Sequence, residues 1–436
     1  MGIVVRTGSA QRKHFPLAVD GFLPASVVVP LTQEARCRCT STVEPGQVVQ
    51  EGDVIARPLF SADTDHCALI HAPVPGVVDA VVASELPDGK QDLGIKIRLS
   101  GRFSYLGKHT ETRDDWQQKN PDALVRSLAQ NGVVNTFSTA APQSLAYDIV
   151  QSREKKAPLL LVRLFDESPS RLTDLLLYET FPEAVMRGVA ITARALRAHA
   201  VALLYDRRHR VPDFSAYADA IPYGAIPVDT RVYPSGLKRA LGAFVRSVRT
   251  DEPFIHAGDA DVYVDVSTML SVCTAIADDT PVVRRYITVE GDCLPAYGLI
   301  NVTLGMSIAA VAEQCGGFIR TPTVIIINGL MTGTTTPSLD TPITKSVKSI
   351  SFLSAHRVYD GRECACIGCG DCRRACPYHL APDILYEHAS GWRRADALLV
   401  QSAALCVSCG LCNAVCPARL PIAEFISLLL SRKKET

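Results

Sequence analysis

The sequence predicts a multidomain α+β protein in which four structural units follow one another along the chain. Three observations lead to this prediction. The chain has 436 residues, a length typical of about three or four domains. Short β-branched stretches give way near residue 121 to alternating helical and apolar segments. The chain then closes with two cysteine runs that share one spacing.

Residues 1–105 are predicted to form an all-β unit. Glycine and proline break their β-branched stretches, and two segments place glycines at turns between apolar residues, 43–56 (VEPGQVVQEGDVIA) and 70–82 (IHAPVPGVVDAVV). These segments resemble the barrel-sandwich hybrid of lipoyl and biotinyl carriers. The stretch between them, 57–69 (RPLFSADTDHCAL), has no lysine to carry a prosthetic group, so we expect a structural role for this unit.

The middle of the chain predicts two further units. In residues 115–255, an amphipathic helix from Pro121 is followed by apolar strands at 157–165 (APLLLVRLF) and 201–206 (VALLYD), with helical sequence between them. This βαβ rhythm is typical of a Rossmann-like α/β domain with a parallel sheet. Residues 256–350 are more mixed, and their strands and single helix predict a β-grasp module of the SLBB-like kind.

The doubled cysteine run carries the most specific signal. CIGCGDCRRACP at 366–377 and CVSCGLCNAVCP at 406–417 share the spacing of two-cluster bacterial ferredoxins, in which the fourth cysteine of each run binds the other cluster. We therefore expect residues 351–436 to form an α-helical ferredoxin domain with two [4Fe–4S] clusters. The expected ligands are Cys366, Cys369, Cys372 and Cys416 for the first cluster, and Cys406, Cys409, Cys412 and Cys376 for the second.

Zinc and disulfides are the alternatives that paired C-x2-C spacing leaves open. Zinc sites usually take two cysteine pairs, whereas each run here has four cysteines and a proline, which favours the clusters. After the second run, apolar residues recur at helical spacing in residues 420–434. They predict a terminal helix that packs on the ferredoxin core through Ile422, Phe425, Leu428 and Leu429.

Composition narrows the remaining function classes. The formal net charge is zero and both signs are evenly mixed, so we expect no nucleic-acid partner. Seven cysteines outside the runs are scattered and are typical of reduced thiols in a cytosolic protein. The first fifteen residues lack the apolar core of a signal peptide, and the longest apolar runs are too short to cross a bilayer. Any membrane contact is therefore expected to come through partner subunits.

One further group of metal-ligand residue types lies outside the runs. His66, Cys67 and His71 fall at a spacing that zinc can use. Because no second ligand pair stands nearby in the sequence, we expect a loop without metal.

Five segments in this order resemble the RnfC family, the peripheral subunit of Rnf ion-translocating electron-transport complexes. They are the N-terminal hybrid motif, residues 231–245, 287–308 and 315–345, and the doubled cysteine runs. The resemblance implies a peripheral electron-transfer subunit at the cytoplasmic face of the cell membrane. Its two clusters would relay electrons between a soluble donor, on the NADH or ferredoxin side, and membrane subunits. The alternative is a stand-alone iron–sulfur reductase or adaptor, such as a cobalamin-reductase-like protein.

The same resemblance implies NADH and FMN sites in residues 115–255, around a loop of the form G-x-G-G-A-x-F-P-T. Here Asn135 and Thr136 stand where glycine backbone should face a phosphate, and Arg163 and Leu164 replace an Asn-Gly pair of a second family segment. We therefore expect the NADH and FMN sites to be lost or strongly weakened. A rearranged anion site at 233–241 (YPSGLKRAL) is the alternative.

Overall fold

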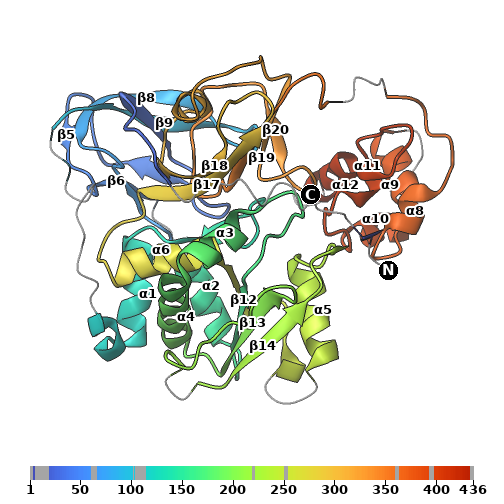
Figure 1. Cartoon of the computed structure of the whole chain (residues 1–436), viewed down its shortest axis with the longest axis horizontal. Coiled ribbons are helices and arrows are strands. Elements are labelled where there is room, and N and C mark those ends of the chain that lie inside the picture. The colour runs from blue at the N-terminus through green and yellow to red at the C-terminus, as the bar shows by residue number, and fades with distance from the viewer. Residues whose placement is uncertain are drawn as a thin grey trace.

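The computed structural model places four units side by side, two of them built on β-sheets, one on a parallel sheet with helices and one on helices alone (Figure 1). It describes residues 3–4, 19–59, 66–101, 103, 114–218, 221–249, 254–358, 363–391 and 397–432.

The first unit packs a four-stranded sheet against a three-stranded sheet. The sheet orders are β3-β9-β8-β5 and β4-β6-β7. The strands are β3 (Ser26–Pro30), β4 (Cys39–Ser41), β5 (Val48–Val49), β6 (Val54–Pro58), β7 (Ile70–His71), β8 (Gly76–Glu85) and β9 (Gln91–Leu99). Val27, Ile55 and Ile97 fill the space between the sheets and are at most 1% exposed. The glycine-punctuated β pattern therefore yields a two-sheet unit, as predicted.

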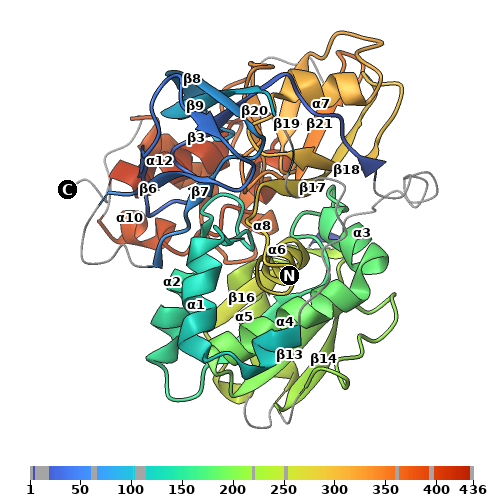
Figure 2. The same cartoon turned by 90° about the vertical axis from the view of Figure 1, so that its left-hand side faces the viewer.

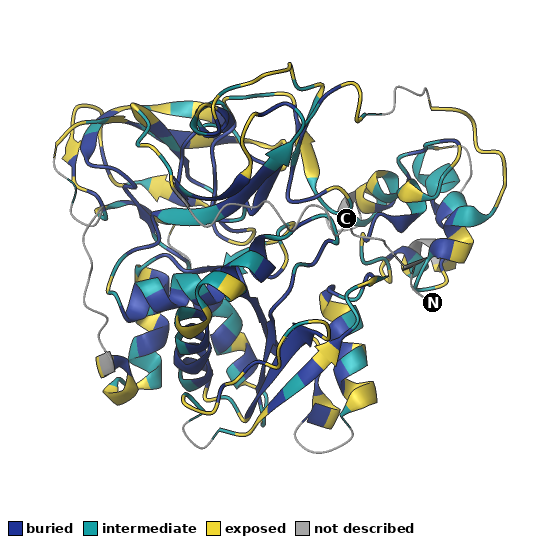
Figure 3. Cartoon of the chain, viewed as in Figure 1, coloured by how far each residue is buried: buried dark blue, intermediate teal, exposed yellow. Residues whose placement is uncertain are grey.

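A parallel sheet of order β14-β13-β12-β16 forms the second unit. Its elements are α1 (Pro121–Gln130), β10 (Val134–Asn135), β11 (Gln143–Ser144), α2 (Leu145–Arg153), β12 (Leu159–Arg163), α3 (Thr173–Thr180), α4 (Pro182–Leu196), β13 (Ala200–Asp206), β14 (Tyr223–Val228), β15 (Val232–Tyr233), α5 (Lys238–Val248), β16 (Val262–Asp265) and α6 (Val266–Ile276). Helices α1, α2, α4 and α6 pack on one face and α5 on the other (Figures 1 and 2). Every residue of β12 and β13 is buried, as their continuous apolar runs predict (Figure 3).

A mixed six-stranded sheet of order β2-β18-β17-β21-β19-β20 forms the third unit. Its elements are β2 (Val19–Asp20), β17 (Arg284–Gly291), β18 (Gly298–Thr303), α7 (Ile308–Gln314), β19 (Val324–Ile327), β20 (Thr334–Thr336) and β21 (Ser349–Leu353). The predicted boundary at residue 256 is wrong, because β16 pairs with β12 and α6 packs on the parallel sheet. The boundary at 350 also moves, since β21 continues to Leu353. One apolar core runs from the parallel sheet into this sheet.

The fourth unit is helical and holds both cysteine runs. It contains α8 (Asp371–Ala375), α9 (Pro382–Ala389), α10 (Ala397–Ala403), α11 (Leu411–Ala414) and α12 (Ile422–Arg432). The terminal helix packs on its neighbours as predicted, with Phe425 against Tyr386 at a ring distance of 5.0 Å. The predicted face needs one correction: Leu428 is 51% exposed, and Ile426 is buried instead.

Within the ranges that the structure describes, no helix combines the length and the apolar character that a membrane crossing requires.

Candidate functional site

The two cysteine runs fold into matching local structures. Each run turns at a glycine with left-handed backbone, Gly370 at φ 73° and Gly410 at φ 74°, and a short helix begins at the next residue. Glycine suits both positions because a side chain at positive φ is strained. The third cysteine of each run, Cys372 or Cys412, lies in that helix. The repeated sequence thus produces a repeated fold.

Four cysteines line one small cavity of the helical unit. Cys366, Cys369 and Cys372 come from the first run, and Cys416 comes from the second. These are the four predicted ligands of the first cluster. Cys366 and Cys369 are exposed, and Ile367 between them is 68% exposed. Two of the four thiols of the first group therefore lie at the protein surface, while Cys372 is buried.

The remaining four predicted ligands form a second group. The thiol of Cys376 lies close enough to Cys406 and Cys409 to act electrostatically on both. Cys412 stands in the same relation to Cys406 and Cys409. Burial raises the pKa of the Cys409 thiol to about 11 and that of Cys412 to about 12. Metal coordination opposes such a shift because it requires the thiolate.

The second group faces the parallel-sheet unit. The hydroxyl of Tyr233 donates to the carbonyl oxygen of Cys409 at 2.6 Å, and Tyr233 is only 2% exposed. Gly410 lies against the loop after β19, so that a Cβ added there would stand 2.3 Å from the carbonyl oxygen of Met331. The second group therefore sits at the junction of units, whereas the first group faces solvent.

The loop considered as a rearranged anion site contributes to this junction. The Arg239 guanidinium, at the start of α5, lies 4.9 Å from the ring centroid of Tyr378 and donates to the carbonyl oxygen of Leu405 at 3.3 Å. Lys238 lies over the ring of Tyr263 at 5.0 Å. Both cations are thus engaged with aromatic rings of the protein.

A crevice for nucleotides is expected where the strand order of a doubly wound sheet reverses, at the carboxyl ends of the strands. In this sheet that point lies between β12 and β16. Arg163, the last residue of β12, fills it and is fully buried. Its guanidinium donates to the carbonyl oxygens of Gly236 at 2.6 Å and Phe137 at 3.0 Å, and lies 4.1 Å from the Phe137 ring centroid.

The end of β10 and the loop that follows it also bond to residues of this crevice. The backbone N–H of Thr136 donates to Thr268 Oγ1 at 3.0 Å, and that of Phe137 donates to Asn135 Oδ1 at 3.1 Å. The Asn135 amide donates to the carbonyl oxygen of Tyr263 at 2.8 Å. Two backbone N–H groups of this loop are therefore already bonded within the protein and are not available to a phosphate.

A buried ion-pair network lies behind this loop. Lys348 Nζ donates to Asp174 at 2.7 Å and also contacts Asp265, and all three side chains are fully buried. Burial alone would raise the pKa of Asp265, but the positive charges of Lys348 and Arg163 outweigh it and lower that pKa. Asp265 also accepts from Thr136 Oγ1 at 3.1 Å. Side chains of the protein thus bond to one another within the crevice.

These residues do not fit a flavin or a dinucleotide at the switch point. The guanidinium of Arg163 donates to carbonyl oxygens within the crevice, and the backbone N–H groups of Thr136 and Phe137 are already bonded within the protein. The sequence indicated the replacement of glycine by Asn135 and Thr136 and the presence of Arg163. It gave no sign that Arg163 would bridge two carbonyl oxygens, because Gly236 lies 73 residues further along the chain.

Comparison with known proteins supports the order of units. Residues 2–102 match the RnfC barrel sandwich hybrid domain, and residues 365–420 match a 4Fe-4S dicluster domain. The chain is 24% identical over 83% of its length to a subunit of the proton-translocating ferredoxin:NAD(+) oxidoreductase complex of Clostridium ljungdahlii, of which it covers 78%. It is 25% identical over 87% of its length to a subunit of the ion-translocating oxidoreductase complex of Haemophilus influenzae, of which it covers 57%.

A solved NAD+-reducing [NiFe]-hydrogenase in the H2-reduced state aligns with 75% of this chain and 64% of its own, at 13% identity and a TM-score of 0.48. The chain spans about half the length of several curated relatives, for example 48% of the matching ion-translocating oxidoreductase subunit from Vibrio cholerae. The mixed α/β architecture, the N-terminal hybrid and the C-terminal dicluster domain agree with the fold predicted from sequence. The predicted resemblance is therefore confirmed: the chain carries an RnfC-type N-terminal domain and a 4Fe-4S dicluster domain, and it is similar over most of its length to proteins named as subunits of ion-translocating oxidoreductase complexes.

Proposed function

We propose that this chain relays electrons as a peripheral subunit of an Rnf-type ion-translocating oxidoreductase. Two [4Fe–4S] clusters would be held by the crossed ligand sets, Cys366, Cys369, Cys372 and Cys416 for the first and Cys406, Cys409, Cys412 and Cys376 for the second. The clusters supply one-electron redox chemistry when bound. The observation that carries the proposal is the cavity in which Cys416 of the second run joins three cysteines of the first.

The protein's own residues orient this relay. Tyr233 and Arg239 hold the second group against the parallel-sheet unit, while Cys366 and Cys369 remain exposed. A redox partner that approaches from solvent would meet the first group. The second group would then exchange electrons only through the first group or through a partner that reaches the junction.

The chain would not oxidise NADH at the switch point of its parallel sheet. Arg163 fills that place, and the N–H groups of Thr136 and Phe137 are already bonded within the protein. The parallel-sheet unit would then act as a scaffold for the helical unit. The six-stranded sheet with α7 would be an SLBB-like β-grasp module, and it would extend this scaffold because it shares an apolar core with the parallel sheet.

The cofactor content of anaerobically purified protein tests the proposal. We expect about eight irons and eight acid-labile sulfides per chain. Acid treatment should release no stoichiometric flavin, and the purified chain should not reduce a dye with NADH. Stoichiometric FMN would contradict the scaffold role, and zinc bound by the two cysteine runs in place of iron would contradict the relay.

Co-purification tests the assignment to a membrane complex. In mild detergent, we expect the tagged chain to bring down multi-span membrane subunits at the cytoplasmic face of the cell membrane. Recovery with a soluble corrinoid enzyme instead would favour the stand-alone reductase or adaptor. The iron content tests the clusters independently of the assignment to a membrane complex, because it does not depend on which partner is found.

A further inference from the structure

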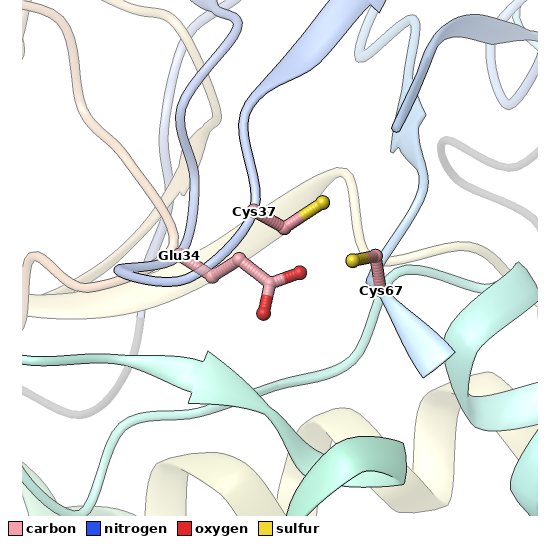
Figure 4. A group of neighbouring side chains, drawn as sticks. All are labelled: Glu34, Cys37 and Cys67. Carbon is pink, nitrogen blue, oxygen red and sulfur yellow. The ribbon is translucent and has the colours of Figure 1, made fainter. Parts of the chain in front are cut away.

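A separate cluster of metal-ligand side chains lies in the first unit, away from both cysteine runs. Glu34 and Cys37 belong to the loop between β3 and β4, and Cys67 precedes β7. A carboxylate oxygen of Glu34 and the sulfur atoms of Cys37 and Cys67 all lie within 4.8 Å of one another. Figure 4 shows the two sulfur atoms pointing toward each other, with the carboxylate turned toward the same space.

The carboxylate of Glu34 is held in place by backbone donors. Its Oε1 accepts from the N–H of Ala68 at 2.9 Å, and its Oε2 accepts from the N–H of Ser144 at 2.7 Å. A carboxylate has about four lone-pair sites, so each oxygen keeps capacity for a metal ion. The N–H of Ala35 donates to the carbonyl oxygen of Pro142 at 2.7 Å and fixes the loop itself. The ligand is therefore oriented before any ion arrives.

The sulfur atoms need little movement to share one ion. Zinc–sulfur bonds of about 2.3 Å at a tetrahedral angle place two sulfur atoms about 3.8 Å apart. The span of the present group, 4.8 Å at most, is close to that value. A shift of about 1 Å between the two sulfur atoms is therefore enough to reach zinc geometry.

The charge of the site also suits a divalent cation. Lys345 is buried nearby, where its Nζ donates to the carbonyl oxygens of Leu69 at 3.0 Å and Gly132 at 2.6 Å and acts electrostatically on Glu34. The negative charge of the Glu34 carboxylate is already balanced by the positive charge of the Lys345 ammonium group. When two thiol protons are exchanged for one Zn²⁺, the net charge of the buried group stays unchanged, so no uncompensated charge is created.

We propose that Glu34, Cys37 and Cys67 bind one structural zinc ion that ties the loop between β3 and β4 to the segment before β7. Zinc fits because it is borderline-soft and accepts thiolate and carboxylate together. A water molecule completes four-coordination. The sequence prediction of a loop without metal considered only neighbours of Cys67, whereas its partners stand thirty residues earlier.

Metal analysis of the full chain with both clusters loaded tests this proposal. Protein expressed with zinc in the medium should contain one zinc per chain in addition to the cluster iron. Zinc-edge X-ray absorption should show two sulfur atoms at about 2.3 Å and oxygen in the remaining positions. Cys37→Ser and Cys67→Ser should each reduce zinc affinity at least tenfold and leave the iron content unchanged.

Cys315→Ser is the control, because Cys315 is buried like Cys37 but lies in the third unit at the end of α7. This variant should keep its zinc. The proposal is overturned if wild-type protein holds no zinc, if the absorption spectrum shows no sulfur ligand, or if the Cys37 and Cys67 variants bind zinc as tightly as the control. The absorption measurement needs no variant, so a variant that fails to fold does not decide the outcome.

Discussion

Cys376 is the last cysteine of the first run and Cys416 is the last of the second, yet each lies with the thiols of the opposite run. Cys416 lines the cavity of the first run, and Cys376 acts on the thiols of Cys406 and Cys409. The sequence predicted this exchange because both runs have the spacing of two-cluster bacterial ferredoxins, in which the fourth cysteine binds the other cluster. Single substitutions can therefore separate crossed from uncrossed ligation.

Replacing Cys376 by serine should damage the cluster of the second run. We expect the chain to lose about four of eight irons, with the electron paramagnetic resonance signal of the solvent-facing cluster retained. Cys364→Ser is the control, since Cys364 is exposed and stands outside both groups. Loss of the solvent-facing signal with the buried one intact would show that each run binds its own cluster.

His71 makes the first unit sensitive to acid. Burial, and secondarily the charge of Lys345, lowers the pKa of its imidazole to about 3. The unfolded chain takes up this proton near pH 6.5, whereas the folded chain does not, so stability is lost as pH falls from 6.5 toward 3. At pH 5 the loss amounts to about 2 kcal/mol.

Thermal unfolding at pH 7 and pH 5 measures this effect. His71→Gln should show a smaller drop in the unfolding temperature between the two pH values than the wild type. His356→Gln, at an exposed position, should keep the wild-type drop. An equal drop in both variants would mean that His71 is not responsible.

At the level of secondary structure, the junction depends on Gly410 more than on its counterpart Gly370. Both have left-handed backbone, and alanine at either position costs about 1–2 kcal/mol of backbone strain. Only at Gly410 would the added Cβ also meet the carbonyl oxygen of Met331, at 2.3 Å. Gly410→Ala should therefore loosen the helical unit from the rest, and Gly370→Ala should not.

Limited trypsin digestion distinguishes the two alanine variants. We expect Gly410→Ala to release the helical unit several-fold faster than Gly370→Ala, while both keep their N-terminal units intact. Equal release rates in the two variants would mean that the effect comes from local backbone strain and not from the contact with Met331.

Elements with continuous or periodic patterns were predictable, and those that depend on distant partners were not. Strands β12 and β13 follow from their apolar runs. Strand β16 has only four residues, and nothing in its sequence indicates that it pairs with β12. In α12, the buried positions Ile422 and Ile426 are four residues apart, whereas Leu428 falls six residues from Ile422 and so points away from the packed face. The filling of the crevice by Arg163 likewise required knowledge of where Gly236 lies.

Across the whole molecule, the two groups of thiols differ in access. The first group opens to solvent beside Ile367, and the second is covered by Tyr233 and the start of α5. Apolar residues that surround a surface-exposed redox centre are typical contact points for a partner. On the proposed function, the partner of this chain would therefore dock over Ile367.

Ile367→Glu should slow electron exchange with the membrane fraction several-fold and leave the iron content unchanged. The carboxylate replaces an apolar contact and must be desolvated when the partner docks. Val211→Glu is the control, because Val211 is similarly exposed, at 65%, but lies in the parallel-sheet unit. Equal rates in both variants would exclude the surface beside Ile367 as the docking point.

The cavity shared by Cys416 and the first run also bears on how a cell would mature this protein. Each cluster needs a cysteine from the other run, so insertion of one cluster draws both runs together and prepares the second site. Half-filled chains should therefore be rare. When iron is scarce, the supply would be concentrated in complete molecules rather than spread over many incomplete ones, and native mass spectrometry of protein from iron-limited cells should find mainly chains with two clusters or none.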